Sequence, residues 1–248
     1  MEPLLVVAAL AAFFTAAFLK GVSGLGFATT CLGLLASVLD PRISIPLVII
    51  PSLASNFMVM IDAGNFRAVF RRFVVLYLSA VPGLIAGLWC LSVMDAAQVR
   101  LGLGLILAFY GLWALWRGVL LLPPRVGRIL AVPVGLVSGF VNGMTGSQIM
   151  SILPYLLSLG LDKNTLVQSI NTAFTISSCV MLLGLGKLGL LDGSIMLVSA
   201  LGIHVVGLGI FLGGRVRRRV SEERFRTVVL VMLVLLGVSL AWRSLVAL

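Results

Sequence analysis

A glycine-rich stretch, K-G-V-S-G-L-G-F, carries side-chain hydrogen-bond donors at residues 20–27. Lys20 supplies an ammonium group and Ser23 a hydroxyl, and the glycines let another group approach the backbone closely. We expect the stretch to end one helix and to begin another at Phe27, and the free N–H groups of a helix N-terminus attract anions. The stretch therefore predicts a cradle for a small anion; the alternative is that its small residues serve close helix packing.

A second stretch of this kind, G-M-T-G-S-Q, begins at Gly143. At the offset between the two stretches, 143 − 21 = 122, Ser23 aligns with Thr145. We expect this second turn to start a helix at Gln148, so that both helix beginnings can point at one central site. The candidate binding residues of the two stretches are Lys20, Ser23, Gly24, Gly26, Thr29, Thr30, Asn142, Thr145, Gly146, Ser147 and Gln148.

Two other apolar segments carry polar side chains at helical spacing. Ser52, Ser55 and Asn56 stand at i, i+3 and i+4, which places them on one face of a helix, and Asn171 and Thr175 stand four residues apart. Such faces either form a second wall of the site or make hydrogen bonds between helices, and the residue types do not decide between the two. The candidate binding residues added by these segments are Ser52, Asn56, Asn171 and Thr175.

Two titratable side chains in apolar segments have competing interpretations. Lys20 pairs with an anion or carries a proton if it lies at membrane depth, and otherwise it extends to the lipid headgroups. His204 is the single histidine, and its counterpart at the offset of 122 is Leu84, which gives a proton relay no support. We interpret His204 as a structural residue with satisfied hydrogen bonds.

The sequence lacks the short motifs of common catalytic and nucleotide-binding sites. It contains no H-E-x-x-H, no G-x-S-x-G and no G-x-x-x-x-G-K-[ST], and its 3 cysteines have no paired spacing. We therefore predict no catalytic residues, no metal site and no cofactor. A membrane-embedded enzyme stays as a minor alternative.

The elements that position these residues are hydrophobic helices. The chain has 248 residues, of which 60% are hydrophobic and only 10% charged, with a mean hydropathy of +1.20. About 20 apolar residues span a bilayer core, and the composition predicts an all-α polytopic membrane protein. The predicted segments are about 4–19, 24–39, 43–61, 69–91, 98–117, 127–142, 147–160, 164–184, 192–213 and 224–246.

The offset of 122 divides the chain into two repeats, residues 1–122 and 123–248, of about five segments each. An odd number of segments places tandem repeats in inverted topology. Arginines gather at residues 67–72, 117–128 and 215–226, and the positive-inside rule makes these loops cytoplasmic in an inner (plasma) membrane. The formal charge of +10 is thus assigned to topology and not to nucleic-acid binding. The first two and the sixth and seventh segments are either full spans or re-entrant hairpins.

These patterns resemble the sulfite exporter TauE/SafE family of membrane transporters. The resemblance rests on K-G-V-S-G-L-G-F followed by L-D-P-R-I-S-I-P-L-V-I-I-P, and on S-G-F-V-N-G-M-T-G-S-Q leading into L-P-Y-L-L-S-L-G-L-D-K. It covers nearly the whole chain. It implies transport of small anions, sulfite and organosulfonates among them.

Taken together, the residues and the resemblance predict a secondary transporter that exports a small anion by alternating access of its two repeats. An anion channel is the main alternative, and a membrane scaffold is a lesser one. The expected partners are the anionic substrate and the lipid bilayer. The fifth and tenth segments are apolar all round, which is compatible with lipid contact or with a homodimer interface.

Overall fold

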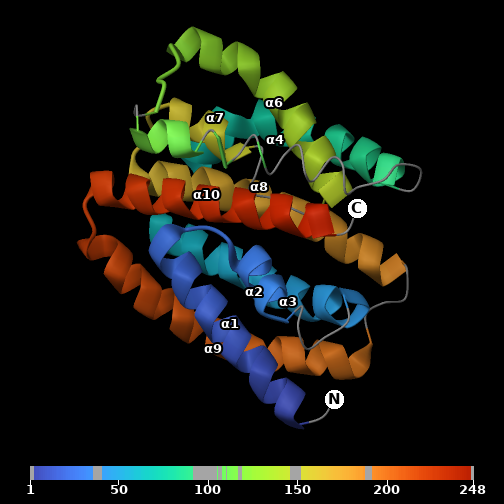
Figure 1. Cartoon of the computed structure of the whole chain (residues 1–248). Coiled ribbons are helices and arrows are strands. Elements are labelled where there is room, and N and C mark those ends of the chain that lie inside the picture. Colours follow the sequence, from blue (N-terminus) through green and yellow to red (C-terminus); the bar gives the residue numbers. More distant parts are fainter. Residues whose placement is uncertain are drawn as a thin grey trace. The chain divides into compact units, whose positions relative to one another are not determined.

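The computed structural model describes residues 3–35, 41–91, 105, 108–109, 111–116, 119–145, 152–187 and 192–246, and the regular elements in these ranges are all helices. The all-α prediction is therefore confirmed for them (Figure 1). The helices are α1 (Pro3–Ser23), α2 (Phe27–Leu35), α3 (Pro41–Ala63), α4 (Phe66–Leu91), α6 (Pro124–Thr145), α7 (Ile152–Ser158), α8 (Lys163–Lys187), α9 (Gly193–Arg219) and α10 (Glu222–Val246).

Within the described residues, 6 helices are long and apolar enough to cross a membrane. These spans are Leu5–Ser23, Pro46–Ala63, Phe66–Gly87, Pro124–Asn142, Lys163–Leu183 and Ile195–Arg219. Large apolar side chains such as Ile61, Trp89 and Trp116 are exposed on the helices, as expected for a surface that meets hydrocarbon. The chain is accordingly a multi-pass membrane protein.

Hydropathy predicts ten segments. Apart from the fifth and the short second and seventh, each segment corresponds to one helix of nearly the same range. The fifth, 98–117, lies mostly outside the described residues. One prediction is wrong in detail, because both glycine-rich turns begin later than expected. Helix α1 continues through Lys20 to Ser23, and α6 continues through Gly143 to Thr145. In apolar surroundings a broken backbone hydrogen bond costs more than an unfavourable glycine, so the helices persist.

The helices form two compact units. Unit 1 consists of Met1–Gly64 and Asn171–Ser221, and unit 2 consists of Asn65–Ile170 and Glu222–Leu248. Each unit therefore combines helices from both halves of the sequence. Helix α8 belongs to unit 2 up to residue 170 and to unit 1 beyond it.

In unit 1, helix α1 packs along α9, which also contacts α3. The α1–α9 contact brings backbone against backbone, because a Cβ atom at Gly213 would lie 2.3 Å from the carbonyl oxygen of Phe18, and one at Gly209 would lie 2.9 Å from that of Phe14. At Gly202 a side chain makes the close contact, because a Cβ atom there would lie 2.5 Å from the ring of Phe13. Small residues let helices approach closely in membranes, and a side chain at these positions would push α1 and α9 apart.

In unit 2, helix α4 packs along α6 by the same device. A Cβ atom at Gly139 would lie 1.9 Å from the carbonyl oxygen of Ala80. Tyr155 of α7 donates a 2.8 Å hydrogen bond to the carbonyl oxygen of Gly127 in α6, which ties the short helix α7 to α6. Each unit is thus held by one tightly packed helix pair.

Candidate functional site

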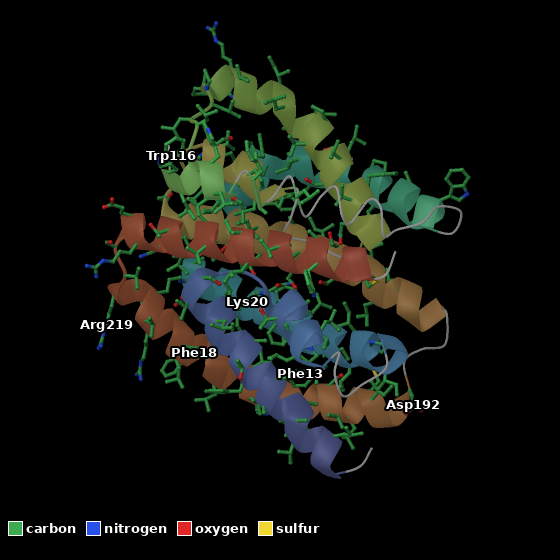
Figure 2. All side chains as sticks on the ribbon, in the orientation of Figure 1. Phe13, Phe18, Lys20, Trp116, Asp192 and Arg219 are labelled. Carbon is green, nitrogen blue, oxygen red and sulfur yellow. The ribbon has the colours of Figure 1, made fainter. Side chains whose placement is uncertain are left out.

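Lys20 lies near the end of α1 with its side chain only 1% exposed (Figure 2). Its Nζ atom donates a 3.0 Å hydrogen bond to Oγ of Ser55 and another to Oδ1 of Asn56, both on α3. The spacing of Ser55 and Asn56 puts them on the face of α3 that meets α1. Because the ammonium group is held inside unit 1, it does not extend to headgroups as the alternative interpretation required.

The partners of Lys20 are two neutral oxygens. Neither Ser55 nor Asn56 is an acid, and the carboxylate of Asp62 on the same helix pairs with Arg217 and Arg218. The Nδ2 atom of Asn56 is buried and has no hydrogen-bond partner in this part of the chain. Burying a charge without a counter-ion is costly, and so is burying an unpaired donor. The cluster of Lys20, Ser55 and Asn56 therefore combines an amine that can carry a positive charge with an unpaired N–H donor, and an anion would satisfy both.

The glycine-rich turn follows Lys20 directly in unit 1. Gly24 and Gly26 have φ angles of 77° and 85°, in the left-handed region where a Cβ atom is strained. The hydroxyl of Ser23 lies 2.8 Å from the carbonyl oxygen of Leu19 and 3.2 Å from that of Leu25. It also accepts a 3.2 Å hydrogen bond from the backbone N–H of Leu25. A single hydroxyl thus closes the turn on both sides.

Asn171 holds the turn from another helix. Its Nδ2 atom, on α8, donates a 2.9 Å hydrogen bond to the carbonyl oxygen of Gly24. Helix α2 then begins at Phe27, as predicted, and its first backbone bond runs from Thr30 N to the carbonyl oxygen of Gly26 at 2.9 Å. The preceding N–H groups of α2 form a helix N-terminus, which carries about half a positive charge beside the turn.

The other candidate residues of unit 1 have supporting positions. The carbonyl oxygen of Ser52 accepts a 2.7 Å hydrogen bond from the hydroxyl of Ser55. Thr175 donates a 2.8 Å hydrogen bond to the carbonyl oxygen of Asn171 and lies 3.4 Å from Sδ of Met60. Thr30 is half-buried. The structure thus brings Lys20 together with the α3 face, and Ser23 and Gly24 together with Asn171.

The candidates of the second stretch are only partly described. Asn142 is buried on α6 in unit 2. Thr145 ends that helix, and its side chain lies outside the described residues, as does that of Thr29 on α2. The positions of Gly146, Ser147 and Gln148, and the predicted helix start at Gln148, also lie outside them.

One residue of the site is missing from the predicted binding residues. Ser55 contacts Lys20, and its spacing from Ser52 had placed it on the correct face. His204 is exposed on α9, and its interpretation as a structural residue with satisfied hydrogen bonds stays a prediction. The residues next to His204 in the sequence are apolar, so they do not indicate which face of α9 is buried against other helices.

The only strongly buried arginine described in unit 1 lies near the C-terminal end of α9. Arg217 is 2% exposed and pairs with Asp62 of α3, while Arg218, whose side chain is 54% exposed, pairs with the other oxygen of the same carboxylate. Burial makes the pair with Arg217 much more sensitive to loss of its partner than the exposed pair. The carboxylate of Asp62 therefore ties α3 to α9.

Comparison with known proteins gives a single kind of match. Neither the curated proteins nor the solved structures contain a significant match to the chain. The model of the sulfite exporter TauE/SafE family matches residues 8–240 of the 248. The match includes the first glycine-rich turn, Lys20 and all six membrane-capable helices apart from the first residues of α1. The chain belongs to the sulfite exporter TauE/SafE family of membrane transporters.

Proposed function

We propose that the chain is a secondary transporter that exports a small anion, such as sulfite or an organosulfonate, and that Lys20 is the cation that binds it. One observation carries the proposal: a fully buried ammonium group beside a helix break is bonded to neutral oxygens and not to a carboxylate. Ionisable groups inside membrane segments are costly and commonly mark substrate pathways. An anion that enters the cluster supplies the missing negative charge.

The glycine-rich turn adds donors to this cation. The beginning of α2 offers backbone N–H groups, and the Nδ2 atom of Asn56 offers a further donor that is otherwise unpaired in the described residues. Together they match the several acceptor oxygens of a sulfite or sulfonate group. Asn171 acts as a positioning residue, because it holds the carbonyl of Gly24 and so keeps the turn in place.

A transporter also needs two conformations, in which the site is open to opposite sides of the membrane. Inverted repeats can provide these two conformations, and the order of the helices supports such repeats. Shifting α1 (3–23) by 122 gives 125–145, against Pro124–Thr145 for α6. Shifting α3 (41–63) gives 163–185, against Lys163–Lys187 for α8. The tight helix pairs correspond as well, since α1 packs on α9 in unit 1 and α6 packs on α4 in unit 2.

Three further features of the proposal follow from the repeats. The arginine-rich segments 67–72, 117–128 and 215–226 lie on the cytoplasmic side of the inner membrane, by the positive-inside rule. The break in the helical backbone at Gly24 and Gly26, directly before α2, supports a re-entrant half-helix in this segment. The two repeats, residues 1–122 and 123–248, then open the site to one side of the membrane at a time. A homodimer is the assembly that we propose, with apolar helix surfaces at its interface.

Flux measurements test the proposal. The purified protein is reconstituted in liposomes, and uptake of sulfite, sulfoacetate, taurine and sulfate is measured with and without a pH gradient. We expect saturable uptake of at least one anion, with an apparent affinity that Lys20→Met weakens. Linear uptake up to high concentration would favour a channel. No uptake of any of the four anions, by protein that is folded, would contradict the proposal.

The turn provides a second test. Replacing Asn171 by Ala leaves the buried carbonyl of Gly24 without this donor, which costs about 1–3 kcal/mol. We expect weaker substrate binding together with lower thermal stability. Thr15→Val is the matched control, because it removes an exposed hydroxyl of unit 1 that donates to the carbonyl oxygen of Ala11 in its own helix α1. Equal effects of both changes would argue against a specific role for the turn.

A further inference from the structure

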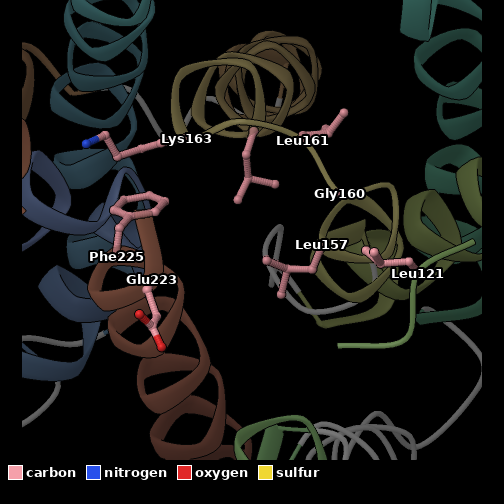
Figure 3. A pocket seen from close by; sticks show the side chains of 8 residues that line it. Leu121, Leu157, Gly160, Leu161, Lys163, Glu223 and Phe225 are labelled. Carbon is pink, nitrogen blue, oxygen red and sulfur yellow. The ribbon is translucent and has the colours of Figure 1, made fainter. Parts of the chain in front are cut away.

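Unit 2 contains a pocket that the proposed anion site does not use. It has a volume of about 400 Å³, within the usual range for small-molecule sites (Figure 3). Its walls come from the segment before α6, from α7, from the turn between α7 and α8, and from the first turn of α10. The lining residues are Leu121, Leu157, Gly160, Leu161, Lys163, Leu166, Glu223 and Phe225.

The inner walls of the pocket are apolar. Four leucines and the ring of Phe225 line it, and the left-handed turn residue Gly160, at φ 61°, adds no side chain. The Nζ atom of Lys163 lies 6.0 Å from the centre of the Phe225 ring. Figure 3 shows the ammonium end of Lys163 directed away from the leucines. These walls suit a hydrocarbon chain.

Two charged side chains line the pocket, Lys163 and Glu223, and the acid is the group that an ammonium ion would pair with. The carboxylate of Glu223 lies below Phe225 in Figure 3, in the first turn of α10. It is exposed, and Arg224 follows it directly in the sequence. An ammonium group would pair with Glu223, and a phosphate a few bonds away would come near the guanidinium that follows. A headgroup with phosphate alone would instead be repelled by the carboxylate.

We propose that this pocket binds phosphatidylethanolamine, with part of an acyl chain between the leucines and the ethanolamine ammonium group on Glu223. The membrane supplies such a lipid at the correct depth, because the pocket lies where α8 and α10 begin and where the segment before α6 ends. Leu121 and Glu223 belong to arginine-rich segments that we place at the cytoplasmic surface, so the lipid comes from the cytoplasmic leaflet. The site is independent of anion transport, and its assignment to the cytoplasmic leaflet rests on the topology proposed above.

Lipid retention tests the proposal. The full chain is purified from nanodiscs that contain equal amounts of phosphatidylethanolamine and phosphatidylglycerol, and the lipids that stay bound are counted by mass spectrometry. An exposed ion pair predicts a preference of about two- to fivefold for phosphatidylethanolamine. Glu223→Gln should bring the ratio to about one. Asp162→Asn, which neutralises an exposed acid of unit 2 outside the lining residues and keeps the cap of α8, should leave the preference unchanged.

A second variant separates the acyl chain from the headgroup. Leu121→Trp adds bulk at an exposed position on the pocket wall, so it should lower the retention of both lipids without changing their ratio. Size-exclusion profiles check that each variant is folded. Equal retention of the two lipids by the unaltered protein would overturn the proposal, and so would an unchanged preference in folded Glu223→Gln. Full retention by folded Leu121→Trp would overturn the placement of the acyl chain.

Discussion

The most informative perturbation is Lys20→Met, which keeps much of the length of the side chain and removes its charge. Lys20 is bonded to Ser55 and Asn56 and has 1% exposure, so an anion in the cluster meets this ammonium group away from water. A hydrogen bond to a charged group contributes about 1.5–3 kcal/mol. Its loss should weaken anion binding by about 10- to 150-fold, at 1.4 kcal/mol per factor of ten.

The assay is concentration-dependent uptake of radiolabelled sulfite into proteoliposomes, which gives an apparent KM and a maximal rate. Lys163→Met is the matched control, because it removes the same charge from unit 2. Ser55→Ala removes one neutral partner and keeps the charge, and we expect only a few-fold change. If Lys20→Met is inserted and folded but its apparent KM stays within twofold of the unaltered protein, Lys20 does not bind the anion and the proposed site is wrong.

Three other predictions concern stability, measured by thermal unfolding of the protein in detergent. Gly139→Val should destabilise the protein by about 1–3 kcal/mol, because a Cβ atom at this position would lie 1.9 Å from a facing carbonyl oxygen, whereas Gly193→Val should have a smaller effect, since a Cβ atom there would meet no described atom within 4 Å. Asp62→Asn should cost about 3–5 kcal/mol, because it leaves the buried arginine of α9 without its counter-ion, whereas Arg218→Gln, at a side chain 54% exposed, should cost about 0–1 kcal/mol. Partial burial raises the pKa of Asp162, but hydrogen bonds from the first turn of α8 outweigh this effect and hold the pKa below its ordinary 3.8. The stabilising contribution of Asp162 is therefore present above pH 3.8 and is lost as the pH falls through the lowered pKa. Asp162→Asn keeps the helix cap and should abolish this part of the pH dependence.

The sequence predicted the helices well because hydrophobic length is a direct signal in a membrane protein. The helix beginning at Phe27 was also predictable, since the glycines before it fix where regular backbone stops. The exact ends of α1 and α6 were not, because propensity places glycine outside helices while an apolar environment keeps backbone hydrogen bonds closed. The order of residues around a glycine does not show whether the backbone there is surrounded by apolar groups.

The site was predictable in part for a similar reason. Helical spacing identified the face of α3 that carries Ser55 and Asn56, and composition singled out Lys20. Which oxygen the ammonium group meets depends on how α1 packs against α3, and that contact joins residues 35 and 36 positions apart in the sequence. The hydrogen bond from Asn171 to Gly24 spans 147 positions and has no local signal at all.

The closure of the first turn by Ser23 has a consequence for how the turn adapts. A hydroxyl carries one proton, and here two carbonyl oxygens, those of Leu19 and Leu25, lie within reach of it. The proton serves one of them at a time, so rotation about a single C–O bond switches the turn between two bonding patterns while the chain trace stays fixed. Rotation of the Ser23 hydroxyl therefore frees one of the two carbonyl oxygens next to Lys20 to accept another hydrogen bond, and no helix has to move.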